Sequence, residues 1–232
     1  MVGQDPLEGL LDGSLFVHPV LDFSLRFPEG WTTVNTHAAV GAVSPARDAE
    51  VILEGQGPGS DPRAAADAFF AKPPSGAKIS RRGGEALVLA GGPAWREQAE
   101  LRQGSAVAAL DVVWLVHQGQ IYRITALRPA LMGKFGKELA LEVARSFRPA
   151  TPQEKQGITV TRLRSARARA GESLESFSAR TGNTWKPTEL AVMNGFLENE
   201  PLVEGQLLKI AVEEPWQPPA KETPAPAGAE PG

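Results

Sequence analysis

The sequence predicts an α+β fold in two parts, a larger antiparallel α/β sandwich followed by a smaller βααβ module. Runs that alternate apolar with polar residues follow one another between residues 86 and 127, as in an antiparallel sheet. Apolar residues then recur at helical spacing between residues 132 and 147, which indicates an amphipathic helix. Farther along, residues 161–213 carry the signals of a strand, two helices and a second strand.

Composition excludes several classes of function. The 232 residues suffice for one medium domain and one small one, with 42% hydrophobic and 22% charged residues. A net charge of −3 argues against nucleic acid as a partner, because Lys and Arg are not in broad excess. The absence of cysteine excludes disulfides, thiol catalysis and thiolate metal sites. No stretch approaches the ~20 apolar residues of a transmembrane segment.

The first part opens with a polar stretch, residues 1–13, that we expect to be a linker. Trp31 follows a turn and is a candidate core residue. Asp61 can cap a helix N-terminus, and Pro62 suits the first helical position because its missing N–H costs nothing there. This helix should end after Phe70. Strands are expected at residues 14–17, 22–27, 38–43 and 50–54.

A meander of strands is expected after a turn at Gly83-Gly84. Trp95, Ala99 and Leu101 share one face, and polar residues occupy the other, which is typical of a half-solvated sheet. Residues 107–116 are almost continuously apolar and should form the central strand, covered on both faces. The four strands are expected at residues 86–90, 95–102, 106–116 and 120–127. The closing helix carries the apolar stripe Met132, Phe135, Leu139, Val143 and Phe147.

Residues 14–148 resemble the PsbP/Mog1-like α/β sandwich in the order of these elements. Pro28-Glu29-Gly30-Trp31 is the local motif of the resemblance. The resemblance implies a domain that more often binds proteins than performs chemistry. Residues 149–160 are predicted to be an interdomain linker, and residues 214–232, rich in Pro, Ala, Glu and Gly, a disordered tail.

The second part begins with a strand that Gly171 should interrupt. Ser173 can cap the first helix, on which Leu174 and Phe177 share one face. Gly182 supplies the left-handed stop of that helix.

Pro187 suits the start of a second helix, whose Leu190 and Met193 should face the core. Asn194-Gly195 should end it, and residues 207–212 are expected to form the closing strand.

These glycine, leucine and asparagine positions, with the ending Gly205-Gln206-Leu207-Leu208-Lys209-Ile210, resemble a LysM module. The resemblance implies binding of peptidoglycan or another N-acetylglucosamine-containing glycan in a groove between two loops. By position, the groove residues are Gly171, Glu172, Ser173, Leu174, Gly195, Phe196, Leu197 and Glu198. Glu172-Ser173 stands where Asp-Thr is usual in the family. Two alternatives therefore stay open: a working glycan site, and a degenerate LysM used for protein contacts.

Nearly all of residues 7–214 resembles the C-terminal, non-catalytic region of bacterial periplasmic zinc metallopeptidases related to HtpX and BepA. Segments that carry the resemblance include Phe16-Val17-His18-Pro19 and Ala144-Arg145-Ser146-Phe147-Arg148-Pro149. The resemblance implies a role in envelope protein quality control, with zinc held only by a catalytic domain absent from this sequence. Residues 1–6 lack a secretory signal pattern, so we expect a fragment of a periplasmic or cell-envelope protein.

The residues that carry most chemistry form no recognisable catalytic motif. His18, His37 and His117 have no second ligand at metal-site spacing, and we expect His18 and His117 to be ordinary loop residues. Glu97 and Glu100 should point to opposite faces of one strand, which does not suit paired acid and base work. We therefore predict no catalytic residues in this chain. Three hypotheses remain: an accessory binding region, a protein–protein scaffold and a stand-alone hydrolase. The sequence shows no active site for the third.

Overall fold

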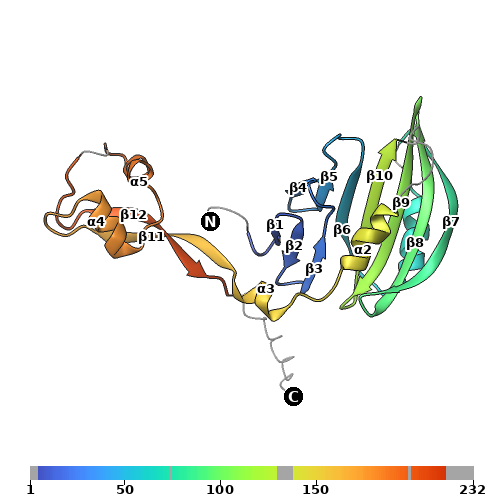
Figure 1. Ribbon diagram of the computed structural model, residues 1–232, viewed down its shortest axis with the longest axis horizontal. Coiled ribbons are helices and arrows are strands. Elements are labelled where there is room, and N and C mark those ends of the chain that lie inside the picture. Colours follow the sequence, from blue (N-terminus) through green and yellow to red (C-terminus); the bar gives the residue numbers. More distant parts are fainter. Residues whose placement is uncertain (1–4, 74, 130–137, 198–199, 218–232) are drawn as a thin grey trace, which may run out of the picture. The chain divides into compact units, whose positions relative to one another are not determined.

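The computed structural model describes residues 5–73, 75–129, 138–197 and 200–217 (Figure 1). Two compact units divide between Gln156 and Gly157. The structure is rich in sheet and has few helices, in agreement with the α+β class.

The described part of the first unit contains two antiparallel sheets (Figure 1). The smaller sheet has the order β1-β2-β3 and the larger one β4-β5-β6-β10-β9-β8-β7. The smaller sheet comprises β1 (Leu10–Asp12), β2 (Leu15–His18) and β3 (Phe23–Arg26). The larger comprises β4 (Thr32–Asn35), β5 (Val40–Val43), β6 (Glu50–Pro58), β7 (Ala77–Leu89), β8 (Gly92–Gln103), β9 (Ala106–His117) and β10 (Gln120–Pro129).

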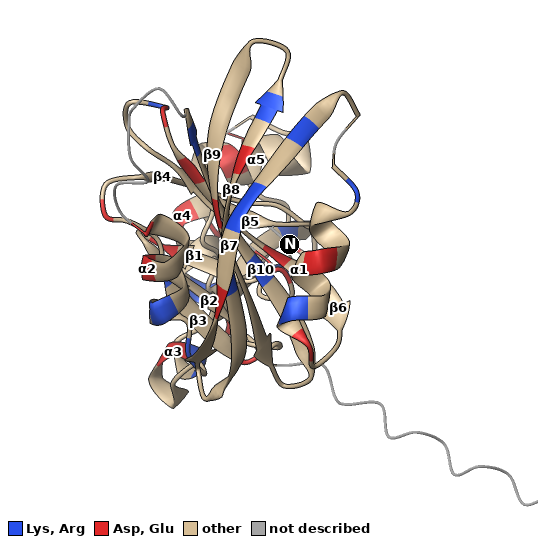
Figure 2. Ribbon diagram, turned by 90° about the vertical axis from the view of Figure 1, so that its right-hand side faces the viewer, with Lys and Arg blue, Asp and Glu red and all other residues tan. Residues whose placement is uncertain are grey.

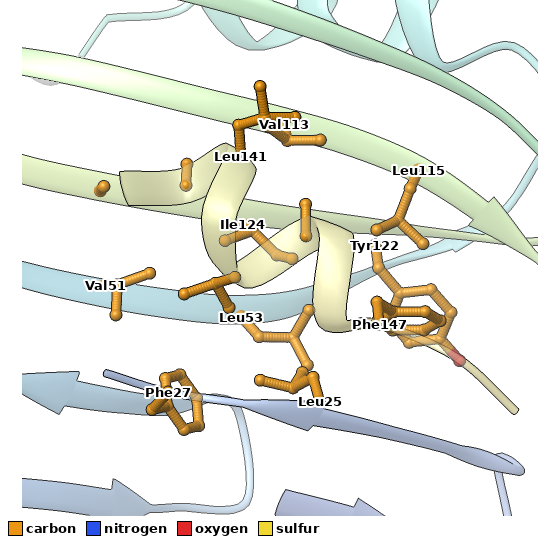
Figure 3. Packing of buried hydrophobic residues seen from close by; sticks show 14 of the residues in the cluster. Leu25, Phe27, Val51, Leu53, Val113, Leu115, Tyr122, Ile124, Leu141 and Phe147 are labelled. Atoms are coloured by element: carbon orange, nitrogen blue, oxygen red, sulfur yellow. The ribbon is translucent and has the colours of Figure 1, made fainter. Parts of the chain in front are cut away.

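One face of the larger sheet packs against α2 (Leu139–Ser146) and the smaller sheet. Figure 3 shows Leu141 of α2 and Leu25 of β3 beside side chains from β6, β9 and β10. On β9, Val113 and Leu115 belong to this core and are wholly buried. Phe147, directly after α2, stacks on Phe23 with ring centroids 4.7 Å apart.

The opposite face of the larger sheet is covered by α1 (Pro62–Phe70). Ala66 and Phe70 of this helix pack with Trp114 of β9, which is completely buried. Asp61 caps the helix, its Oδ1 accepting from the Ala64 backbone N–H at 2.9 Å. The predicted cap, helix and doubly covered central strand are therefore confirmed.

Several expectations about the first unit were wrong. The predicted linker 1–13 contains β1, which pairs with β2. Gly83-Gly84 lies inside β7, at the point where the register with β8 shifts. Gly84 leaves room for Trp95, since a Cβ at this position would be 2.5 Å from the Trp95 ring. The face of β8 expected to be solvated buries Arg96, which is 6% exposed, because Asp111 of the neighbouring strand pairs with it.

β7 forms one edge of the larger sheet and was predicted only in its second half. Its first half is mostly exposed and carries Lys78, Arg81 and Arg82, among the basic residues coloured on β7 in Figure 2. Charged side chains on an edge strand oppose its pairing with another strand. The polar composition explains why no hydrophobic pattern predicted it.

The described part of the second unit consists of an antiparallel strand pair and two helices. The order is β11 (Thr159–Arg167), α4 (Leu174–Thr181), α5 (Pro187–Asn194) and β12 (Leu207–Pro215). The eight residues of its buried core are Ala168, Leu174, Phe177, Leu190, Ala191, Leu202, Leu208 and Ile210. This is the strand, helix, helix, strand order that the sequence predicts.

The limits of the second unit differ from the predicted ones. The expected linker 149–160 contains α3 (Pro152–Gln156) and the first residues of β11. β12 continues to Pro215, so the predicted tail begins inside a strand, and residues 218–232 lie outside the described residues. Met132 and Phe135 of the closing-helix prediction also lie outside them.

Candidate functional site

Seven of the eight predicted groove residues lie on or directly beside two loops of the second unit. Gly171–Leu174 connects β11 to α4, and Gly195–Leu197 follows α5. Glu198, the eighth residue, lies outside the described residues. Gly171 (φ 73°) and Gly195 (φ 77°) both adopt the left-handed conformation, which favours glycine. Each therefore begins its loop with a sharp change of chain direction.

Glu172 is held by hydrogen bonds within its own unit. One carboxylate oxygen accepts from the Arg169 backbone N–H at 2.8 Å, and Arg180 Nη2 donates to the same oxygen at 2.7 Å. Arg180 Nε donates to the other oxygen. The hydrogen bonds from Arg180 are the main cause that lowers the pKa of Glu172 to about 2. The side chain therefore fixes the loop and is already fully engaged.

The next two residues also have structural roles. Ser173 Oγ accepts from the Ser176 N–H at 3.2 Å, and Ser176 Oγ accepts from the Ser173 N–H at 2.9 Å, which closes a reciprocal cap at the start of α4. Leu174 is only 4% exposed and belongs to the core. Gly171 and Ser173 are the exposed residues of this segment, and Ser173 is engaged in the cap.

The second loop divides its side chains between core and solvent. Phe196 packs against the same buried cluster that contains Leu174, so both loops rest on one core. Leu197 is 66% exposed. Just before the loop, Asn194 Oδ1 accepts from the Lys209 N–H at 2.7 Å, and its Nδ2 donates to the Lys209 carbonyl at 2.9 Å. These bonds tie the end of α5 to β12.

Exposed apolar side chains that the sequence analysis missed occur close in sequence to the second loop. Met193, expected in the core, is 47% exposed, because the buried side of α5 is centred on Leu190 and Ala191. Further exposed apolar side chains in this part of the sequence are Val192, Val203 and Leu207. Apolar side chains that lie together at a surface often mark a binding site.

Charged residues of the larger sheet pair with one another on both faces of β8. Glu97, which is 2% exposed, accepts from Arg81 and from Trp95 Nε1, the latter at 3.1 Å. Burial alone would raise the pKa of Glu97, but the hydrogen bonds outweigh burial and lower it. On the other face, Arg96 donates to Asp111 at 2.8 Å. Both carboxylates are paired with arginines, an arrangement that holds neighbouring strands together and does not suit proton transfer.

His18 and His117 are not ordinary loop residues. Both end strands and are buried, at 9% and 7% exposure. His117 Nε2 lies 2.9 Å from the Asp22 carbonyl, and His18 Nδ1 accepts from the Leu21 N–H at 3.3 Å. Burial lowers the pKa of His18 to about 4, so its ring is neutral at pH 7. The turn sequences hid this burial, because strands distant in the sequence cause it.

Within the described ranges, no group of three or more His, Asp or Glu side chains is arranged to hold a metal ion. No helix in the described part of the chain is both long enough and apolar enough to cross a membrane.

Comparisons with known proteins give low similarity. The sequence matches no protein-family model and no curated protein. A solved structure of PsbP (CyanoP) from Synechocystis sp. PCC 6803 has 15% identity and a TM-score of 0.49, covering 64% of this chain and 99% of that one. A protein from Bacteroides thetaiotaomicron VPI-5482 has 11% identity and a TM-score of 0.46 (78% and 61% covered). LpqN of Mycobacterium tuberculosis, described as involved in cell envelope biogenesis, has 17% identity and a TM-score of 0.39 (54% and 82%).

Proposed function

We propose that the second unit is a LysM-like module that binds peptidoglycan or another N-acetylglucosamine-containing glycan. In this proposal the chain is the non-catalytic accessory region of a cell-envelope zinc metallopeptidase, with a PsbP/Mog1-like first unit. Its setting is the periplasm or envelope, and its role is to hold wall glycan or protein substrates for protein quality control.

The observation that carries the proposal is the combination of two loops on one core with exposed apolar residues beside them. Gly171 and Gly195 bring loop backbone to the surface, where N–H and C=O groups can pair with acetamido and hydroxyl groups of a sugar. Leu197 and Met193 offer apolar surface to the less polar face of a pyranose ring. Glu172 and Ser173 contribute by holding the first loop rigid.

One observation favours the alternative, a protein–protein scaffold with a degenerate LysM. Glu172 is already paired with Arg180, and Leu174 and Phe196 pack on the core, which leaves few side chains of the predicted groove free to contact a sugar. An exposed apolar surface around α5 would suit a protein partner equally.

Co-sedimentation of the full chain with purified sacculi separates the two functions. The proposal predicts that wild-type protein sediments with sacculi and that Leu197→Asp reduces the bound fraction at least about fivefold. Leu163→Asp is the matched control, because Leu163 is also exposed, at 49%, but lies on β11 outside both loops. Absence of sedimentation, or equal losses in the two variants, would contradict glycan binding at these loops.

A further inference from the structure

The first unit contains a cavity of about 320 Å³ lined by residues from both of its sheets. Phe16, His18 and Phe23 come from the smaller sheet, and Leu53 and Tyr122 from the larger one. The loop after β4, Thr36–Ala39, completes the wall. A volume of this size is at the lower end of the range for small-molecule sites, on the order of 300 Å³ and above.

The wall of the cavity is mainly apolar and firmly held. Phe16 and Phe23 are each 2% exposed and Leu53 4%, because all three also belong to the main core. The ring of Phe23 packs against Tyr122, with centroids 5.0 Å apart, and against His18 at 5.6 Å. The packing of these aromatic rings fixes the wall before any ligand arrives.

Two of the residues that line the cavity, His18 and Tyr122, can each donate a hydrogen bond while neutral. His18 Nδ1 accepts the Leu21 N–H, which places the ring proton on Nε2 when the ring is neutral. Burial favours that neutral form, since it lowers the pKa of His18 to about 4. Burial also raises the pKa of Tyr122, so the phenol keeps its proton. Among the described residues, neither His18 Nε2 nor the Tyr122 hydroxyl has a hydrogen-bond partner.

The polar groups at the rim are already paired and do not favour an anion. Asn35 Nδ2 donates to the carbonyls of Glu8 and Gly9, at 3.1 and 3.0 Å. The Glu8 carboxylate, 3.1 Å from His37 Nδ1, places negative charge at the rim. An anionic ligand would therefore meet repulsion at the rim, and the described lining residues include no Lys or Arg to offset it.

We propose that this cavity binds a small, neutral, mainly apolar molecule whose carbonyl oxygen accepts a hydrogen bond from His18 Nε2 or the Tyr122 hydroxyl. The apolar wall selects a compact aromatic or alicyclic body. The two donors select a ketone, aldehyde or ester over a hydrocarbon of the same shape. All lining residues belong to the first unit, so a test of this cavity is independent of glycan binding by the second unit.

A pair of probes tests the proposal: acetophenone, and ethylbenzene, which has nearly the same shape but lacks the oxygen. Each is titrated into the full chain while amide chemical shifts are followed by NMR. We expect shift changes concentrated at the lining residues. Acetophenone should bind roughly fivefold more tightly than ethylbenzene, the effect of about one hydrogen bond.

Variants assign that preference to the donors. Tyr122→Phe removes only a hydroxyl and His18→Leu removes the imidazole, and at least one should lose most of the preference for acetophenone. Val88→Ala, at a residue 77% exposed and outside the cavity, should change neither affinity. Equal affinities for the two probes, shift changes away from the cavity, or a preference that survives the combined Tyr122→Phe and His18→Leu variant would overturn the proposal.

Discussion

The two units achieve a fixed structure by different means. The first has buried clusters on both faces of its larger sheet, joined through the doubly covered strand β9. The second has one cluster of eight buried residues in its described part. A core of that size supplies little stability by itself, since small domains bury a smaller fraction of their surface.

In the second unit, hydrogen bonds from polar side chains to the backbone add to the stability that the small core provides. Asn183 Oδ1 accepts from the Ala211 N–H at 3.1 Å, and its Nδ2 donates to the Trp185 carbonyl at 2.9 Å. Asn194 makes an equivalent pair of bonds to Lys209. In the small unit, the polar side chains of Asn183 and Asn194 thus have structural roles. In the large unit, unpaired polar groups against an apolar wall are the better evidence for a site.

The largest loss of stability should follow from a substitution in the core of the second unit. Phe177 is completely buried, so Phe177→Ala should lower the free energy of unfolding of this unit by about 3–5 kcal/mol. Thermal unfolding followed by NMR should show the second unit melting earlier while the amide signals of the first unit persist. Loss of both sets of signals at one temperature would contradict separate stability of the units.

The next largest loss of stability should come from removing the Asn194 side chain, which hydrogen-bonds to the Lys209 backbone. Asn194→Ala leaves the Lys209 backbone groups without their side-chain partners and should cost about 1–3 kcal/mol. Asn194→Asp keeps the acceptor but removes the amide donor, so urea unfolding should place it between wild type and Asn194→Ala. If the urea midpoint of Asn194→Ala equals that of the wild type, these side-chain hydrogen bonds do not add to the stability of the second unit.

In the first unit, the free energy of unfolding should depend on pH through the buried His18. His18 has a pKa of about 4 in the folded state against 6.5 for an unperturbed ring, so the unfolded state binds the proton first as pH falls. The free energy of unfolding should therefore decrease between pH 6.5 and 4, by on the order of 2 kcal/mol. His18→Leu should remove that part of the pH dependence in denaturant titrations. An unchanged slope in the variant would show that His18 is not the group responsible.

The smallest loss of stability is expected for substitution of Glu172. Its pKa is lowered from 4.5 to about 2, so the stabilisation is complete above pH 4.5 and is lost as pH falls through 2. Because the ion pair with Arg180 is at the surface, Glu172→Gln should shift the unfolding midpoint at pH 7 less than Asn194→Ala does. A larger shift would place Glu172 among the main supports of its unit.

Much of the fold follows from local sequence. The apolar run of β9 and the Asp61-Pro62 start of α1 predict their elements directly, because burial and capping impose those residue types. β4 and the first half of β7 were missed because they are exposed and polar, and backbone pairing with neighbouring strands holds them in place.

The site was less predictable than the fold. Sequence position placed Leu174 and Phe196 in a groove, but both pack on the core, a result that depends on contacts across the whole small unit. The pairing of Glu172 with Arg180 joins the loop before α4 to the last turn of this helix and leaves no local pattern. His18 looked like a turn residue because its burial depends on Phe23 and other residues that surround it only in the folded unit.

The most direct test of glycan binding is an NMR titration of the full chain with a soluble tetramer of N-acetylglucosamine. The account predicts amide shift changes at Gly171–Leu174 and Gly195–Leu197, with the amides of the first unit unaffected. Leu197→Asp should weaken binding and Leu163→Asp should not. A titration that leaves both loops unchanged at millimolar glycan would contradict the central claim and favour a protein partner for this surface.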